Sequence, residues 1–161
     1  MPVTDITHDL EALTLTITAE FAAPVERVWQ IYADPRQLER VWGPPGYPAT
    51  FTDFDFRPGG RATYFMTSPE GEKYGGWWEF TEIAEPSTLR FDDGFADGDL
   101  VPLPDMPVTA NTYSISSAGE GTRLVAVGAF ASTEDLEKVL GMGMIEGATL
   151  AINQIDDLLA A

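Results

Sequence analysis

The chain has 161 residues, of which 44% are hydrophobic and 22% charged, and it contains no cysteine. This length suits a single domain, and the balance of apolar and charged residues is typical of a folded protein. The lack of cysteine excludes disulfides, thiolate nucleophiles and cysteine-ligated metals, and it fits a reducing compartment. We therefore expect one cytoplasmic domain over residues 1–161, with its core at about 13–159.

The charge is strongly negative, because 26 acidic residues against 9 basic ones give a formal net charge of −17. Such a surface repels nucleic-acid phosphates and anionic lipid headgroups, so we expect neither nucleic acid nor a membrane as partner. Met1–Ala12 lacks the basic start and apolar run of a signal peptide, and no stretch is apolar for long enough to span a bilayer. The acidity indicates solubility, with a basic partner protein as the alternative.

The first predicted element is a half-buried strand at Leu13–Phe21, where apolar residues alternate with threonine and glutamate. We expect the residues before it to be loose. After Pro24, apolar residues recur at helical spacing, and Asp34-Pro35 is typical of one helix ending and the next beginning. The second helix ends at Gly43-Pro44-Pro45-Gly46. The chain thus opens with a strand and two short helices.

Short alternating segments separated by turn residues then predict consecutive strands. These are Phe51–Phe56, Arg61–Thr67, Lys73–Ile83, Thr88–Asp92, Pro107–Ser116 and Thr122–Phe130. A break in the alternation at Glu82-Ile83 predicts a bulge, and the composition of Asp93–Met106 predicts an irregular acidic loop. Strands joined by short turns pair with one another, so the sheet is expected to be antiparallel.

A long C-terminal helix is predicted after Ser132, which with Asp135 resembles a capping box. Its apolar stripe is Met144, Ala148, Ile152, Ile155 and Leu159. Three glycines within it, Gly141, Gly143 and Gly147, each cost about 1 kcal/mol relative to alanine. Either the helix is irregular there, or the glycines let a strand or a ligand approach closely.

Six motifs follow one another in a fixed order. They are Phe21-Ala22-Ala23-Pro24-Val25-Glu26-Arg27-Val28-Trp29, then Asp34-Pro35 with Trp42-Gly43-Pro44, then Arg57-Pro58-Gly59-Gly60-Arg61 with Pro69-Glu70-Gly71, then Glu82-Ile83 to Pro86, Gly121-Thr122-Arg123-Leu124, and Gly147 to Leu159. Together they resemble the family named after the activator of Hsp90 ATPase, within the START-like superfamily, also called Bet v 1-like or SRPBCC. The resemblance implies an α+β helix-grip fold, in which a curved antiparallel sheet of six to seven strands surrounds the long C-terminal helix. The strand order derived above predicts the same arrangement.

The chain departs from this family at Ala148 and Ala62, where the family carries bulky aromatic residues. Small residues at these positions enlarge an internal pocket, unless Trp78 or Trp29 fills the space.

One helix cannot fill a strongly bent sheet, so we expect an internal pocket. Strand and helix alternation places Tyr64, Met66, Trp78, Phe80, Phe91, Tyr113, Met144, Ala148 and Ile152 on its wall. Polar contacts are expected from Tyr64, Tyr113, Asn111 and Asn153. A mostly apolar pocket with a few polar groups suits small hydrophobic or aromatic molecules.

The sequence shows no recognisable catalytic constellation, metal-ligand cluster or cofactor motif, so we expect no catalytic residue, metal or cofactor. The one histidine, His8, lies in the segment expected to be loose, and Gly59-Gly60 and Gly75-Gly76 lack the form of a phosphate-binding loop. The charged residues on strands are expected to face outward in ion pairs. They are Asp55, Arg57, Arg61, Glu79, Glu82, Arg90 and Asp92.

Three functions follow. The leading one is binding of a small hydrophobic molecule. The alternative is a cyclase- or hydratase-like enzyme on the same fold, which would need a buried Asp, Glu or Tyr with a shifted pKa. The third, implied by the family name, is interaction with a chaperone. A homodimer with Asp93–Asp105 and Trp77 at its contact also stays open.

Overall fold

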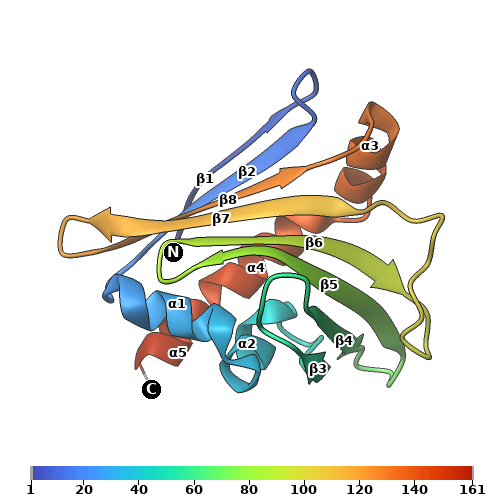
Figure 1. Ribbon diagram of the computed structural model, residues 1–161, viewed down its shortest axis with the longest axis horizontal. Coiled ribbons are helices and arrows are strands. Elements are labelled where there is room, and N and C mark those ends of the chain that lie inside the picture. The colour runs from blue at the N-terminus through green and yellow to red at the C-terminus, as the bar shows by residue number, and fades with distance from the viewer. Residues whose placement is uncertain (1, 161) are drawn as a thin grey trace.

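The computed structural model describes residues 2–160 and consists of one antiparallel sheet and five helical segments (Figure 1). The strands are β1 (Val3–Asp9), β2 (Thr14–Phe21), β3 (Ala49–Phe54), β4 (Arg61–Thr67), β5 (Lys73–Ala84), β6 (Thr88–Ala96), β7 (Thr109–Ala118) and β8 (Gly121–Ala129). The helices are α1 (Val25–Ala33), α2 (Pro35–Trp42), α3 (Thr133–Gly141), α4 (Met144–Asn153) and α5 (Ile155–Ala160).

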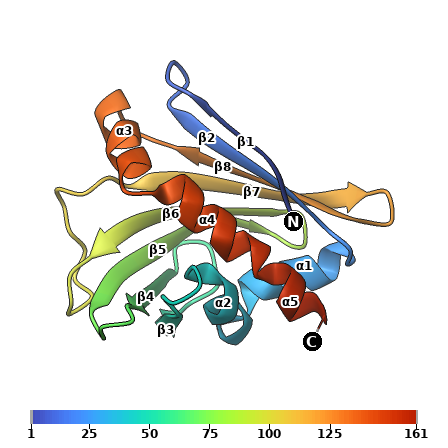
Figure 2. The ribbon, with the colours of Figure 1, turned by 180° about the vertical axis from the view of Figure 1, so that it is seen from behind.

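All eight strands form one curved sheet in the order β1-β2-β8-β7-β6-β5-β4-β3. Helices α1 and α2 connect β2, near one edge of the sheet, to β3 at the other edge. Helices α4 and α5 run obliquely across one face of the sheet (Figure 2). This is the expected helix-grip fold, and α4 is the element that faces the sheet across the candidate site.

The eighth strand is an addition to the prediction, because the N-terminal residues expected to be loose form β1. Ile6 pairs with Ile17, and the strand has an irregularity between Val3 and Asp5. Only Val3 and Ile6 are half-buried, and the other five residues of β1, His8 among them, are exposed. An edge strand with so little buried surface carries no clear alternation, so sequence periodicity does not reveal it.

The predicted C-terminal helix is interrupted, and its parts are α3, α4 and α5. The Ser132 hydroxyl accepts a hydrogen bond from the Asp135 amide at 3.1 Å, as the capping box predicts. Gly143 has a φ of +81°, in the left-handed region, and separates α3 from α4. A methyl group added at Gly141 or Gly147 would meet no atom within 4 Å. The left-handed backbone therefore accounts for Gly143, no strand approaches Gly141 or Gly147 closely, and Gly147 borders the cavity described below.

The core between the sheet and the helices is aromatic. Trp78, Phe80 and Phe91 are at most 1% exposed, and Trp78 stacks on Phe91 with ring centroids 4.0 Å apart. Ala62 is fully buried opposite Trp78 in the β4–β5 register, so the core occupies the space beside this small residue. A second, smaller cluster lies beneath α3 and contains Leu15, Phe130, Leu136 and Val139.

Six of the seven charged residues expected to face outward form ion pairs at the surface, whereas Asp92 is half-buried and forms none within residues 2–160. Arg57 pairs with Asp55 at 2.8 Å, Arg61 with Glu79 at 3.7 Å and Arg90 with Glu82 at 3.9 Å. All six side chains are more than one-third exposed, so each pair contributes only about 0–1 kcal/mol to stability. The predicted bulge is also present, since the β5–β6 register shifts between Phe80 and Glu82.

Within residues 2–160, none of the helices combines the length and the apolar character that a membrane crossing requires.

Candidate functional site

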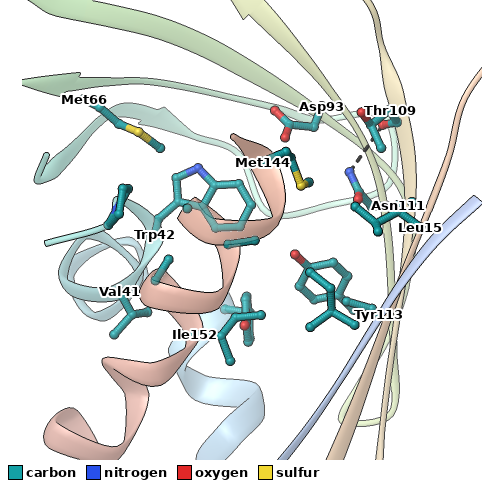
Figure 3. Close-up of a pocket in the computed structure, with 18 of the residues that line it drawn as sticks. Leu15, Val41, Trp42, Met66, Asp93, Thr109, Asn111, Tyr113, Met144 and Ile152 are labelled. Carbon is teal, nitrogen blue, oxygen red and sulfur yellow. Dashed lines mark hydrogen bonds between the residues drawn. The ribbon is translucent and has the colours of Figure 1, made fainter. Parts of the chain in front are cut away.

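A cavity of about 230 Å³ lies between the sheet and α4 (Figure 3). Strands β2, β4, β6, β7 and β8 form one side of its wall, and α1, α2 and α4 form the other. Most of the wall is apolar, contributed by Leu15, Ile17, Val41, Trp42, Pro44, Met66, Ala126, Met144, Ala148, Ala151 and Ile152. Its polar side chains are Tyr32, Tyr64, Asp93, Thr109, Asn111 and Tyr113.

Six of the nine residues placed on the pocket wall by sequence alternation border this cavity. They are Tyr64, Met66, Tyr113, Met144, Ala148 and Ile152. Of the two alanines singled out as departures from the family, Ala148 borders the cavity and Ala62 does not.

The other three residues, Trp78, Phe80 and Phe91, do not border the cavity, because other aromatic rings cover them. The indole of Trp42 lies edge-on to Trp78 at a centroid distance of 4.7 Å and to Phe91 at 6.5 Å. Phe54 and Phe56 cover Phe80 at 5.6 and 5.2 Å. The alternation of a strand indicates its inward face, but it cannot tell which inward residues another element covers.

Of the two asparagines expected to supply polar contacts, one borders the cavity and the other does not. Asn111 borders the cavity, and its amide nitrogen donates to the Thr109 carbonyl at 3.3 Å. Asn153 lies instead beside β1, where its Oδ1 accepts a hydrogen bond from the Val3 amide at 3.2 Å.

Asp93 is a charged residue of the cavity wall that the sequence pattern did not predict. The predicted strand ended at Asp92, but β6 continues to Ala96, and Asp93 pairs with Trp78 on β5 and Thr109 on β7. Aspartate and glycine are depleted in strands, and this favoured the loop prediction. Continuing the alternation of Leu89 and Phe91 by two residues would have placed Asp93 on the inward face.

Asp93 accepts a hydrogen bond from the Tyr64 hydroxyl at 3.2 Å. Tyr64 lies on β4 and Asp93 on β6, so the contact crosses the intervening strand β5. Asp93 is half-buried, and it borders the cavity with its carboxylate among the side chains drawn in Figure 3. The pair forms a polar site in a mostly apolar wall.

Burial raises the pKa of the Asp93 carboxyl to about 7, and the hydrogen bond from Tyr64 opposes this rise only in part. Burial also raises the pKa of Tyr64 well above its usual value, and the nearby Asp93 charge raises it further. The pKa of Tyr113 is raised by burial and then by the neighbouring Tyr32, Asp93 and Tyr64. Near neutral pH, Asp93 therefore exists in both protonation states while the phenols keep their protons.

The indole N–H groups of Trp42 and Trp78 are buried without a hydrogen-bond partner within residues 2–160. Their interaction with the Tyr64 oxygen lowers the pKa of this phenol, but by less than burial raises it. Residues 2–160 also contain no group of three or more His, Asp or Glu side chains that could hold a metal ion.

A curved antiparallel sheet closed by a helix over an apolar cavity defines the class of helix-grip proteins. The family described as "Activator of Hsp90 ATPase homolog 1-like protein" matches residues 22–160. The chain belongs to this family.

Solved structures show the same architecture at high sequence identity. Protein Ms6760 from Mycobacterium smegmatis is 64% identical, with a TM-score of 0.92, and the match covers 98% of this chain and 97% of that one. A protein from Arthrobacter aurescens is 48% identical, with a TM-score of 0.94 and coverage of 98% and 92%. A Rhodobacter sphaeroides protein at 24% identity, with a TM-score of 0.84 and coverage of 97% of both chains, shares the fold. No curated protein matches the chain.

Proposed function

We propose that the protein binds a small hydrophobic or aromatic molecule in the cavity between α4 and the sheet. The observation that carries the proposal is a cavity of about 230 Å³ whose wall is apolar except for a few grouped polar side chains. An apolar protein cavity of about 150 Å³ accommodates benzene. The cavity therefore has room for an aromatic ring with a short chain.

The wall suits such a ligand. Met66 and Met144 are flexible thioethers on opposite sides of the cavity, and methionine adapts to apolar shapes more easily than branched side chains. The rings of Trp42 and Tyr113 offer edges and faces for aromatic contact. The polar groups Asp93, Tyr64 and Asn111 would fix the orientation of a ligand that carries one polar group.

The test is native mass spectrometry of the purified protein with extraction of bound small molecules, followed by thermal-shift measurements with a library of aromatic compounds. We expect compounds that raise the melting temperature of the wild type to have no effect on Ala148→Phe, because the added ring occupies the cavity. Leu150→Phe is the matched control, since Leu150 is 51% exposed on the same helix. If no compound raises the melting temperature and none is extracted, the proposal is wrong.

A second candidate is an enzyme that transfers protons, such as a cyclase or hydratase. The observation that favours it is Asp93, a carboxyl group in a cavity whose pKa of about 7 suits a general acid or base. The test is hydrogen–deuterium exchange at acidic C–H positions of cavity ligands, followed by NMR. We expect exchange to be accelerated by the wild type and not by Asp93→Asn. Equal exchange with both proteins would exclude this role.

A further inference from the structure

We propose that the ligand carries a protonated amine, which Asp93 binds as counter-ion while the apolar wall holds the hydrocarbon body. This inference rests on the proposed function and names the class of molecule bound. Small lipophilic amines, such as arylalkylamines, have the required chemistry.

The charge on the cavity wall favours a cationic ligand. Asp93 is its only carboxyl group, and no Lys, Arg or His borders the cavity within the residues described. An ionised carboxylate in an apolar site is costly unless a cation accompanies it. Since the chain provides no cation there, a cationic ligand would be the missing partner.

Two acceptor atoms of wall residues can receive hydrogen bonds from a ligand. Tyr64 donates to Oδ1 of Asp93, and the hydrogen bonds within residues 2–160 leave Oδ2 without a donor. One N–H of the Asn111 amide donates to the Thr109 carbonyl, and the Asn111 Oδ1 is a second acceptor on the wall. An ammonium group offers three donors, which can satisfy these two acceptors.

The same wall disfavours anionic ligands. A carboxylate or phosphate ligand would lie close to Asp93 with no basic side chain to balance it. Trp42, Tyr64 and Tyr113 border the cavity, and the face of an aromatic ring attracts cations and not anions. The wall therefore discriminates amines from fatty or aromatic acids of the same size.

The other titratable groups on the cavity wall carry no charge that could compete with Asp93. On the cavity wall they are Tyr32 from α1, Tyr64 from β4 and Tyr113 from β7. Burial raises the pKa of each phenol, so all three are neutral near pH 7. The wall residues from α2, α4, β2 and β8 are not titratable, and β5 contributes none to the wall.

The test is calorimetric titration at pH 8 with three probes of the same shape, namely 3-phenylpropylamine, 3-phenylpropan-1-ol and 3-phenylpropionate. We expect the amine to bind about tenfold or more tightly than the alcohol, because a hydrogen bond to a charged group is worth roughly 1.5–3 kcal/mol. The propionate should bind more weakly than the alcohol. At pH 6 the amine should bind more weakly and release about one proton, because Asp93 must ionise to receive it.

Asp93→Asn should lose the preference for the amine and keep the binding of the alcohol. The matched control is Asp92→Asn, because Asp92 is the adjacent carboxylate, does not border the cavity and pairs in register with Glu79. Asp92→Asn should still bind the amine more tightly than the alcohol. If Asp93→Asn does not fold, the relative affinities of the three probes for the wild type and the proton release at pH 6 still test whether the ligand is an amine.

Equal binding of amine and alcohol, or preference for the propionate, would overturn the amine inference and leave the proposed function standing. If none of the three probes binds, the amine inference is overturned too. The proposed function is overturned only if, in addition, no library compound raises the melting temperature and no small molecule is extracted from the purified protein.

Discussion

The phenol ring of Tyr64 lies directly over Gly76, its register partner on β5, and crosses that strand to reach Asp93 on β6. A methyl group at Gly76 would overlap the Tyr64 ring and hydroxyl. The absence of a side chain at this glycine is therefore what allows residues on two strands that are not neighbours to share a hydrogen bond.

This relationship predicts the effect of Gly76→Ala. The added methyl group must displace Tyr64, so the hydrogen bond to Asp93 breaks and the free energy of unfolding falls by about 1–3 kcal/mol. Denaturant unfolding measures the loss of stability. NMR of the Asp93 carboxyl carbon should show its pKa rising above the wild-type value, because the hydrogen bond lowers it. Gly98→Ala is the control, since a methyl group there meets no atom within 4 Å. An unchanged Asp93 pKa in Gly76→Ala would contradict the account.

The raised pKa of Asp93 predicts a pH-dependent stability. Asp93 titrates at about 7 in the folded protein and close to 3.8 when unfolded, so between these values the folded state holds a proton that the unfolded state has released. The stability of the wild type relative to Asp93→Asn should then fall as the pH rises from about 4 to about 7, by up to roughly 1.4 kcal/mol per pH unit, and stay constant above that range. Urea unfolding of both proteins from pH 4 to pH 8 measures the difference. A flat difference would show that the Asp93 pKa is not raised.

Two isoleucines that are partners in the β1–β2 register, Ile6 and Ile17, should contribute differently to the free energy of unfolding. Ile17 is 5% exposed and borders the cavity, whereas Ile6 is half-buried on the edge strand. We expect Ile17→Ala to lower the free energy of unfolding by about 2–5 kcal/mol and Ile6→Ala by about 1 kcal/mol. Denaturant unfolding tests both variants. Equal losses would mean that β1 contributes as much to the core as β2 does.

The sequence predicts the fold well because its strongest signals are periodic. Alternation predicts seven of the eight strands, and the Asp34 and Ser132 side chains cap helices where expected, with Asp34 accepting from the Arg36 amide at 2.9 Å. The β1 strand was missed because only Val3 and Ile6 are even half-buried. The break in the last helix depends on the left-handed backbone of Gly143, and a periodic apolar stripe does not reveal it.

The candidate site could be predicted only in part, for two physical reasons. Trp42 sits at the end of a short helix, and nothing in its local pattern shows that its ring covers Trp78 and Phe91 and itself becomes part of the cavity wall. The composition of Asp93–Met106 is that of a loop, so the sequence pattern does not predict Asp93 as part of a strand. The place of Asp93 in the wall depends on pairing with β5 and β7, which are contributed by distant segments.

The central claim is that a small apolar molecule binds between α4 and the sheet. Its most direct test is the measurement of intermolecular NOEs between 3-phenylpropan-1-ol and the methyl groups of the protein. We predict contacts from the phenyl ring to Ala148, Met144 and Ile152, which border the cavity. Contacts confined to exposed methyl groups such as those of Leu150, with none to these three residues, would contradict the claim.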